Sequence, residues 1–253
     1  MARTAEGRRL TEAHRRQQLA IAAKAEVAAR RLWPRLDVAD LDRSEPAWLA
    51  SNLAVYESMH RDSAALAARY VPMYRDAELG DPAGPTVSAP FARAETTAAL
   101  HIAGPVAVKQ RIAKGVDPRE AHAGGIVALA GIARRQVLRG GRLIVDRSTR
   151  ADGRAVGWRR VTDGDPCPFC GMLASRGPVY GSRQRAQEIG GSGLRYHGGC
   201  GCTAEIVYGG WEPNAAEQRF IERYEAAAAE VDAMGLPRVE KTVLPILRRD
   251  WPA

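Results

Sequence analysis

The stretch DPREAHAGGIVALAGIARRQVLRGG, residues 117–141, contains the strongest helix signals in this chain of 253 residues. Asp117 can accept backbone N–H bonds as the N-cap of a helix, and Glu120 can complete a capping box. Gly140 is expected to end the helix, because glycine readily adopts the left-handed conformation found at helix C-termini. The central sequence AGGIVALAGIA is small and apolar on nearly every side. These features predict a helix over residues 118–139, buried at the centre of a helical bundle.

The residues before this stretch are also predicted to be mainly helical. Leu19, Ala23 and Val27 recur every four residues, which predicts one apolar stripe along a basic N-terminal helix. This helix should end near Pro34, because proline lacks an amide hydrogen and its ring clashes with the preceding turn.

The character of the sequence changes after Gly141. Three segments rich in apolar and β-branched residues are predicted to be strands, namely residues 142–148, 155–162 and 202–208. A helix is expected within residues 213–235, with Pro213 ahead of it and Gly235 after it. The tail that follows it is predicted to be extended, because prolines interrupt its apolar residues.

All four cysteines lie in two short segments, DPCPFCG and HGGCGC, the second of which adds a histidine. The N-terminus is charged where a signal peptide would be apolar, so we expect the chain to stay in the reducing cytoplasm, where disulfides are rare. The cysteines are therefore expected to bind metal, and thiolate and imidazole donors at this spacing favour zinc. The five candidate ligands are Cys167, Cys170, His197, Cys200 and Cys202.

Five candidates compete for the four positions of a tetrahedral site, and two arrangements are open. In one, His197 joins three cysteines; in the other, all four cysteines bind and His197 supports them from outside. Alternation along a strand does not separate Cys200 from Cys202, since residues two apart point to the same face. In either arrangement the expected role of Zn²⁺ is structural, because the module is short of core residues and metal binding contributes folding energy.

Other roles for the cysteines fit the sequence less well. Free cysteines in a core have apolar neighbours, whereas these have proline, aspartate and glycine. A redox C-x-x-C pair normally lies in a thioredoxin-like βαβ pattern, which is missing here. The sequence PCPFC matches half of the zinc deaminase signature, but no H-x-E precedes it. Metalloprotease, P-loop and serine hydrolase motifs are also missing, so we predict that the protein is not an enzyme.

These predictions give an α+β fold class and divide the chain into three parts. Residues 1–141 should form a helical domain. Residues 142–212 should form a small zinc-stapled α/β module with a short β-sheet. Residues 213–253 should form a C-terminal helix and an extended tail.

The net charge of +8 is concentrated at the N-terminal end. Residues 1–36 contain nine Lys or Arg against three Glu. Such a basic helix favours contact with a polyanion such as DNA or with an acidic protein surface. No apolar run reaches the roughly 20 residues that cross a bilayer, so no membrane partner is expected.

The Cys/His motif and its surroundings resemble the C-terminal module of the Mu F-type minor head proteins of tailed bacteriophages, most closely the branch found in phages of actinobacteria. The similarity covers roughly residues 142–210. The family pattern of C-x-x-C, a small-residue segment ending in an aromatic residue, and H-x-x-C-x-C matches Cys167, Cys170, Tyr180, His197, Cys200 and Cys202. Family members often have proline after the histidine and arginine between the last two cysteines, whereas this chain has Gly198 and Gly201.

The resemblance implies a structural role in assembly of the phage head. Mu F-type proteins are low-copy minor capsid components that bind the portal and enter the procapsid, and some are proposed to assist DNA packaging. The implied partners are the portal and the capsid or scaffold proteins, with DNA as a further partner of the basic helix. The implied location is the virion, in the head interior or at the portal. Two alternatives stay open, a capsid maturation protease, a label that some relatives carry, and a zinc-containing nucleic-acid-binding protein.

Overall fold

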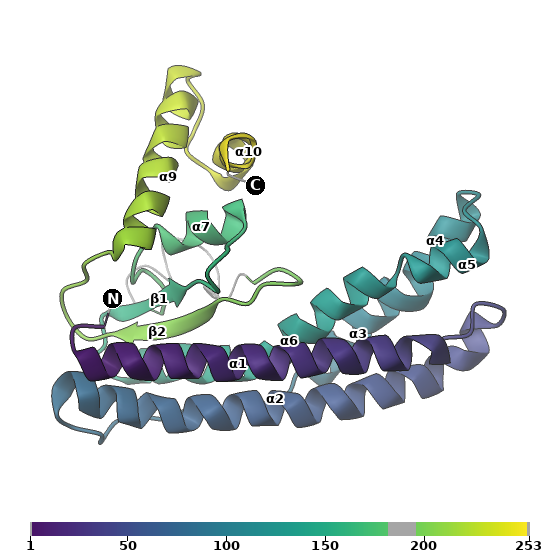
Figure 1. The fold of residues 1–253 in the computed structure, drawn as a ribbon, viewed down its shortest axis with the longest axis horizontal. Helices are drawn as coiled ribbons and strands as arrows, with labels where there is room; N and C mark the ends of the chain where they lie inside the picture. The colour runs from purple at the N-terminus through teal and green to yellow at the C-terminus, as the bar shows by residue number, and fades with distance from the viewer. Residues whose placement is uncertain (1, 182–195, 252–253) are drawn as a thin grey trace.

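Three long helices form the centre of the fold (Figure 1). The computed structural model describes residues 2–181 and 196–251. The long helices are α1 (Ala5–Leu32), α2 (Leu41–Leu79) and α6 (Ile126–Ala151). Helix α1 runs antiparallel to the other two, and each helix packs against both others to form a three-helix bundle.

Shorter elements extend the bundle at one end and cover it on one side. A 3-10 turn (Trp33–Arg35) follows α1, and the bundle is extended by α3 (Arg93–His101), a π-helical turn (Ile102–Val106), α4 (Ala107–Ala113) and α5 (Pro118–Ala123). The covering elements are β1 (Gly157–Val161), α7 (Pro168–Ala174), β2 (Thr203–Val207), α9 (Ala215–Ala233) and α10 (Glu240–Asp250). The strands β1 and β2 pair antiparallel and lie between the bundle and α7 (Figure 1). This mainly helical fold with a small sheet and a C-terminal helix confirms the predicted α+β class.

Two of the predicted helix boundaries are confirmed. The carboxylate of Asp117 accepts hydrogen bonds from the amides of Arg119 and Glu120 at 2.9 and 3.2 Å, which caps α5. Helix α1 ends at Leu32, two residues before Pro34. At both places the local chemistry of capping and of proline is sufficient to set the boundary.

The helix predicted over residues 118–139 differs from the structure in two ways. It is interrupted at Gly124 and Gly125, and its second part, α6, continues beyond Gly140 to Ala151. The predicted helix end at Gly140 and the strand predicted over residues 142–148 are therefore wrong. The boundary predicted after residue 141 falls within α6.

Gly140 and Gly141 lie where the three helices cross, and there they permit close contact instead of ending the helix. A Cβ atom at Gly140 would lie 2.3 Å from the carbonyl oxygen of His60 on α2. A Cβ atom at Gly141 would lie 2.4 Å from Nε2 of Gln18 on α1. The amide of Gly141 also donates a hydrogen bond to Oγ of Ser63 at 2.9 Å. Tertiary contact therefore overrides the preference of glycine for a helix end.

The buried apolar residues form two clusters. One cluster lies at the α5 end of the bundle and includes Trp33, Trp48, Tyr56, Leu129 and Val137. The other joins α2 and α6 to the sheet, α7, α9 and α10, and it includes the side chains of Cys170, Cys200 and Cys202. The cysteine-bearing loops therefore share one core with the helical bundle.

A buried charged network connects the sheet to helices on either side of it. Arg159 of β1 pairs with Glu205 of β2, Nε to Oε1, at 2.6 Å and also bonds Glu217 at the start of α9. Oγ1 of Thr11 on α1 donates to Glu205 at 2.6 Å. These contacts tie α1, the sheet and α9 together, and loss of Arg159 would leave two buried carboxylates without their cation.

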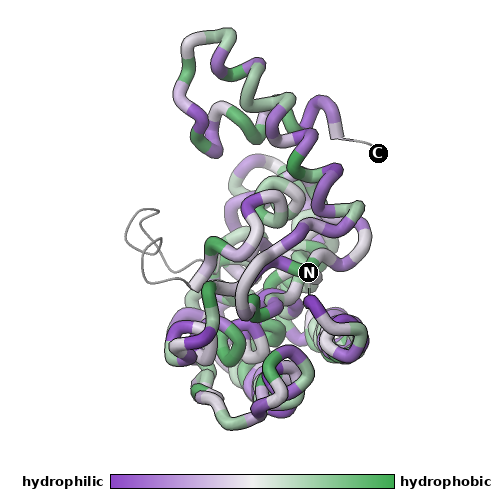
Figure 2. Tube along the Cα trace, turned by 90° about the vertical axis from the view of Figure 1, so that its left-hand side faces the viewer, coloured by the Kyte–Doolittle hydropathy of each residue, from purple (hydrophilic) through white to green (hydrophobic). Residues whose placement is uncertain are grey.

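The C-terminal tail that was predicted to be extended is helical. Helix α10 contains Pro245 and buries Val243, Leu244, Ile246 and Leu247 beside α7 and α9. Burial of these apolar side chains outweighs the backbone hydrogen bond that the proline removes. Figure 2 shows apolar and polar residues interspersed along α9 and α10, which project from the rest of the chain. None of the described helices combines the length and the hydropathy of a membrane span.

Substitution of Gly140 by alanine tests the close helix contact. We expect Gly140→Ala to destabilise the protein by about 1–3 kcal/mol, although alanine favours helices, because the added methyl group overlaps the His60 carbonyl oxygen. Urea unfolding measures the change. Gly153→Ala is the control, since its Cβ would meet no atom within 4 Å, and it should change the free energy of unfolding by less than about 0.5 kcal/mol. Equal stability of the two variants would contradict the contact.

His14 of α1 is buried against α2, where its ring stacks on that of Tyr70 with centroids 4.4 Å apart. Burial lowers the pKa of His14 to about 4, from an ordinary value of 6.5. The folded state therefore holds this imidazole in its neutral form at neutral pH.

Acidification should destabilise the protein through His14. The unfolded chain binds a proton more readily than the folded chain between pH 6.5 and about 4, so stability is complete above this window and falls as the pH decreases through it. The expected slope is up to about 1.4 kcal/mol per pH unit. His14→Phe keeps an aromatic ring against Tyr70 and should remove this part of the slope. Urea unfolding across the window measures it, and identical slopes in both proteins would refute the assignment.

Candidate metal centre

The first pair of cysteines lies at the start of a short helix. Cys167 is the N-cap residue of α7, Pro168 occupies its first position, and Cys170 follows within the first turn. The amide of Gly171 donates to the carbonyl oxygen of Cys167 at 3.0 Å, which closes this turn. The C-x-x-C spacing therefore presents both sulfur atoms from one turn, as metal-binding pairs require.

The second motif forms a loop that lies directly on α6. The amide of Cys200 donates to the carbonyl oxygen of His197 at 3.3 Å, so these two residues belong to one turn. Gly199 has a φ of +79°, which favours glycine, and its amide donates to the carbonyl oxygen of Gly131 at 3.2 Å. A Cβ atom at Gly131 would lie 3.2 Å from that amide nitrogen. Glycines on both sides therefore allow the loop to touch the helix.

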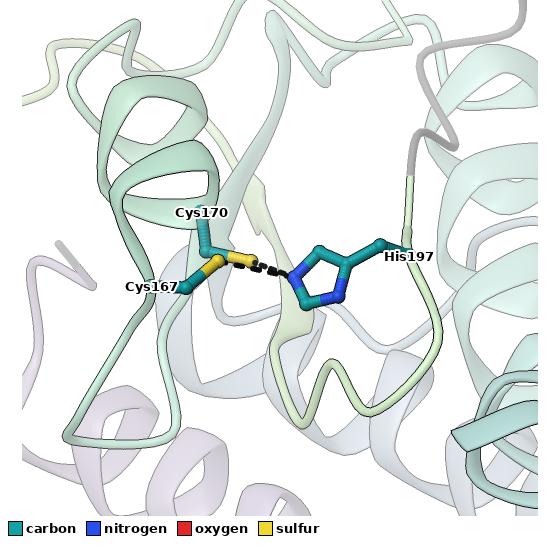
Figure 3. Close-up of side chains that lie close together, drawn as sticks. All are labelled: Cys167, Cys170 and His197. Carbon is teal, nitrogen blue, oxygen red and sulfur yellow. Dashed lines mark hydrogen bonds between the residues drawn. The ribbon is translucent and has the colours of Figure 1, made fainter. Parts of the chain in front are cut away.

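The structure brings all five predicted ligands together. Nε2 of His197 lies 3.2 Å from Sγ of Cys167 and 3.3 Å from Sγ of Cys170 (Figure 3). Two groups of potential ligands overlap at Cys170, one with Cys167 and His197 and the other with Cys200 and Cys202. Within each group the ligand atoms all lie within 4.8 Å of one another. The second group is buried, whereas Cys167 and His197 are partly exposed.

The donor types and the Cys170–Cys200 separation are compatible with a zinc site, and the donors form two groups of three that share Cys170. All four cysteines are free thiols, and the 3.4 Å between the sulfur atoms of Cys170 and Cys200 is far longer than the roughly 2.05 Å of a disulfide. Sulfur ligands about 2.3 Å from a tetrahedral zinc ion lie about 3.8 Å apart, close to the separation found here. Sulfur and imidazole donors suit zinc, whereas magnesium and calcium prefer oxygen.

Hydrogen bonds within the cluster favour charged thiolates at two of the cysteines. Hydrogen bonds with Cys170 and with His197 lower the pKa of Cys167 to about 4. The same bond with Cys167 raises the pKa of His197 to about 9. Hydrogen bonds with Cys170 and Cys202, assisted by two buried arginines, lower the pKa of Cys200 below the usual range of a thiol. Hydrogen bonds with Cys167 and Cys200 raise the pKa of Cys170, so the thiolate, which is the metal-binding form, is favoured at Cys167 and Cys200 but not at Cys170.

Two buried arginines support the second loop, and neither was predicted from the sequence. Arg142 of α6 donates to the carbonyl oxygens of Cys200 and Cys202 at 2.7 to 3.0 Å. Nη1 of Arg160 on β1 lies 3.8 Å from Sγ of Cys200. The two guanidinium carbons lie 3.7 and 4.0 Å from the centre of the Tyr196 ring, a cation–π arrangement. Each arginine lies in an apolar segment of the sequence. Because arginine is rarely buried unless it is paired, this placement could have indicated a buried partner.

The predicted basic helix is present as α1, and its Lys and Arg side chains are exposed except for the partly buried Arg15. Arg9 and Arg15 each pair with a glutamate one turn earlier in the helix. Lys24 and Arg31 lie beside the exposed Val27 along a groove between α1 and α2. Part of the basic charge is therefore neutralised within the helix, and part faces outward.

A protein-family model described as "VG15 protein" matches residues 6–227 of the chain. The match includes the three long helices, both strands and all five potential metal ligands. No curated protein and no solved structure shows a significant match.

Proposed function

This chain belongs to the VG15 protein family, a family of phage proteins, and we propose that it is a structural minor component of the phage head that binds one structural zinc ion. The observation that carries the zinc proposal is the convergence of the Cys/His donors from α7 and from the loop before β2. One ion bound there would tie these two segments to each other. Cys170, Cys200 and Cys202 are buried in the core, as donors of structural zinc sites commonly are, whereas catalytic sites keep a position open.

The proposed role is in head morphogenesis, at the portal and during procapsid assembly or DNA packaging. Family membership supports a phage virion component, and the resemblance of the Cys/His motif to Mu F-type minor head proteins supports the more specific role. The proposed partners are the portal and the capsid or scaffold proteins. The outward-facing Lys24 and Arg31 of α1 favour an acidic protein surface or DNA at that face.

Removal of zinc should loosen one part of the protein selectively. Protein purified without chelator is expected to contain about one zinc ion per chain. Chelation should increase amide hydrogen exchange in α7 and β2, because the ion contributes folding energy to the segments that hold its ligands. The cluster of Trp33 and Trp48 at the far end of the bundle should stay protected. Exchange should return to its original level on addition of Zn²⁺ but not of Mg²⁺. A zinc content near zero would refute the proposal.

Quantitative mass spectrometry of purified phage particles tests the role in the head. The abundance of this chain is compared with that of the major capsid protein, and a few copies per particle are expected for a portal-associated minor component. An abundance equal to that of the major capsid protein would contradict a minor component, and absence from mature heads would mean an assembly-only role, a protease or a wrong family assignment. If the chain is absent, a gel assay for cleavage of the capsid or scaffold protein tests the maturation protease alternative.

A further inference from the structure

The contacts around the two later cysteines differ, and the difference bears on which of them binds metal. We infer that Cys200 rather than Cys202 completes the proposed zinc site, an inference that rests on the proposed zinc binding. The other three ligands are Cys167, Cys170 and His197. Distance alone does not separate the two candidates, because both lie in the buried group around Cys170. Both sulfur atoms also contact Cys170, whereas the turn geometry and the contact with Arg160 separate the two candidates.

His197 has the orientation of a metal ligand. Its Nδ1 lies 2.6 Å from the carbonyl oxygen of Gly198, while Nε2 points to the sulfur atoms of Cys167 and Cys170 (Figure 3). Histidines that bind metal through one ring nitrogen usually donate the other N–H to a carbonyl or carboxylate oxygen. His197 therefore belongs among the ligands, which leaves one tetrahedral position for a third cysteine.

Cys200 lies in the same turn as His197. The spacing H-x-x-C repeats that of the C-x-x-C pair, and the hydrogen bond from the Cys200 amide to the His197 carbonyl oxygen closes the turn. Such a turn presents two donors toward one ion. Sγ of Cys200 also lies 3.4 Å from Sγ of Cys170, so this turn meets the first pair directly. Cys202 lies outside the turn, next to the first residue of β2.

Arg160 gives Cys200 a contact that ligand sulfur atoms commonly receive. Its Nη1 lies 3.8 Å from Sγ of Cys200, within the range of an N–H···S hydrogen bond. Such outer contacts orient a ligand and offset its charge. Arg142 instead bonds the carbonyl oxygens of Cys200 and Cys202 and fixes the backbone between them. The thiol of Cys202, only 1% exposed, then serves as a small core side chain.

Paired serine substitutions test this assignment. In the Co²⁺-loaded full chain, Cys200→Ser should weaken metal affinity at least about tenfold and reduce the thiolate-to-cobalt absorption band by about one third, since one of three thiolates is lost. Cys202→Ser is the matched control, and it should leave both the affinity and the band unchanged. Circular dichroism checks that each variant keeps its helices.

Three outcomes would overturn the inference. Loss of affinity in Cys202→Ser with retention in Cys200→Ser would make Cys202 the ligand. A reduced band in both variants would indicate a site of four cysteines without His197. If Cys200→Ser does not fold, a reduced band in Cys202→Ser alone overturns the assignment. Wild-type protein that binds neither zinc nor cobalt would instead refute the proposed zinc function itself, before any ligand is considered.

Discussion

At Gly140 and Gly141, helix α6 touches α2 and α1 so closely that no side chain fits between them. This contact sets the spacing of the three long helices, and the rest of the fold is arranged around them. The residue that follows, Arg142, makes the hydrogen bonds that hold the cysteine-bearing loop. Gly131 lies nearer the start of α6, and its lack of a side chain lets Gly199 of the same loop approach the helix closely. One helix therefore organises both the bundle and the candidate metal centre.

Buried charge is the second feature that connects the parts of the molecule. Arg159 and its two glutamates join the sheet to α9, while Arg142 and Arg160 lie against Tyr196 beside the cysteines. Burying a guanidinium is costly unless it is paired or fully hydrogen-bonded. Backbone carbonyl oxygens of the second loop accept hydrogen bonds from Arg142, and Sγ of Cys200 lies beside Arg160, while Nη1 of Arg142 is buried without a partner among the described residues. The buried arginines and the cysteines therefore influence one another, since Arg142 and Arg160 help to lower the pKa of Cys200.

Membership in a phage protein family and the Cys/His cluster support the proposed structural role in the phage head. Under the zinc proposal, a bound ion would add folding energy to the segments beside the two-stranded sheet, whose Trp158, Ala204 and Ile206 already pack in the core. The projecting α9 and α10 and the outward-facing cations of α1 offer surfaces for partners in the particle. Under this proposal, zinc stabilises the fold and the surrounding helices make the contacts.

The sequence by itself determined the α+β class, the cap at Asp117, the end of α1 near Pro34 and the grouping of five potential metal ligands. These features depend on the chemistry of neighbouring residues, and the spacing of soft donors is readable without any knowledge of the fold. Only the tertiary structure decided that α6 continues through two glycines and that α10 is helical despite its proline. It also decided that two arginines face the cysteine loop. Each of these outcomes depends on contacts between residues far apart in the chain, where packing and burial outweigh local preference.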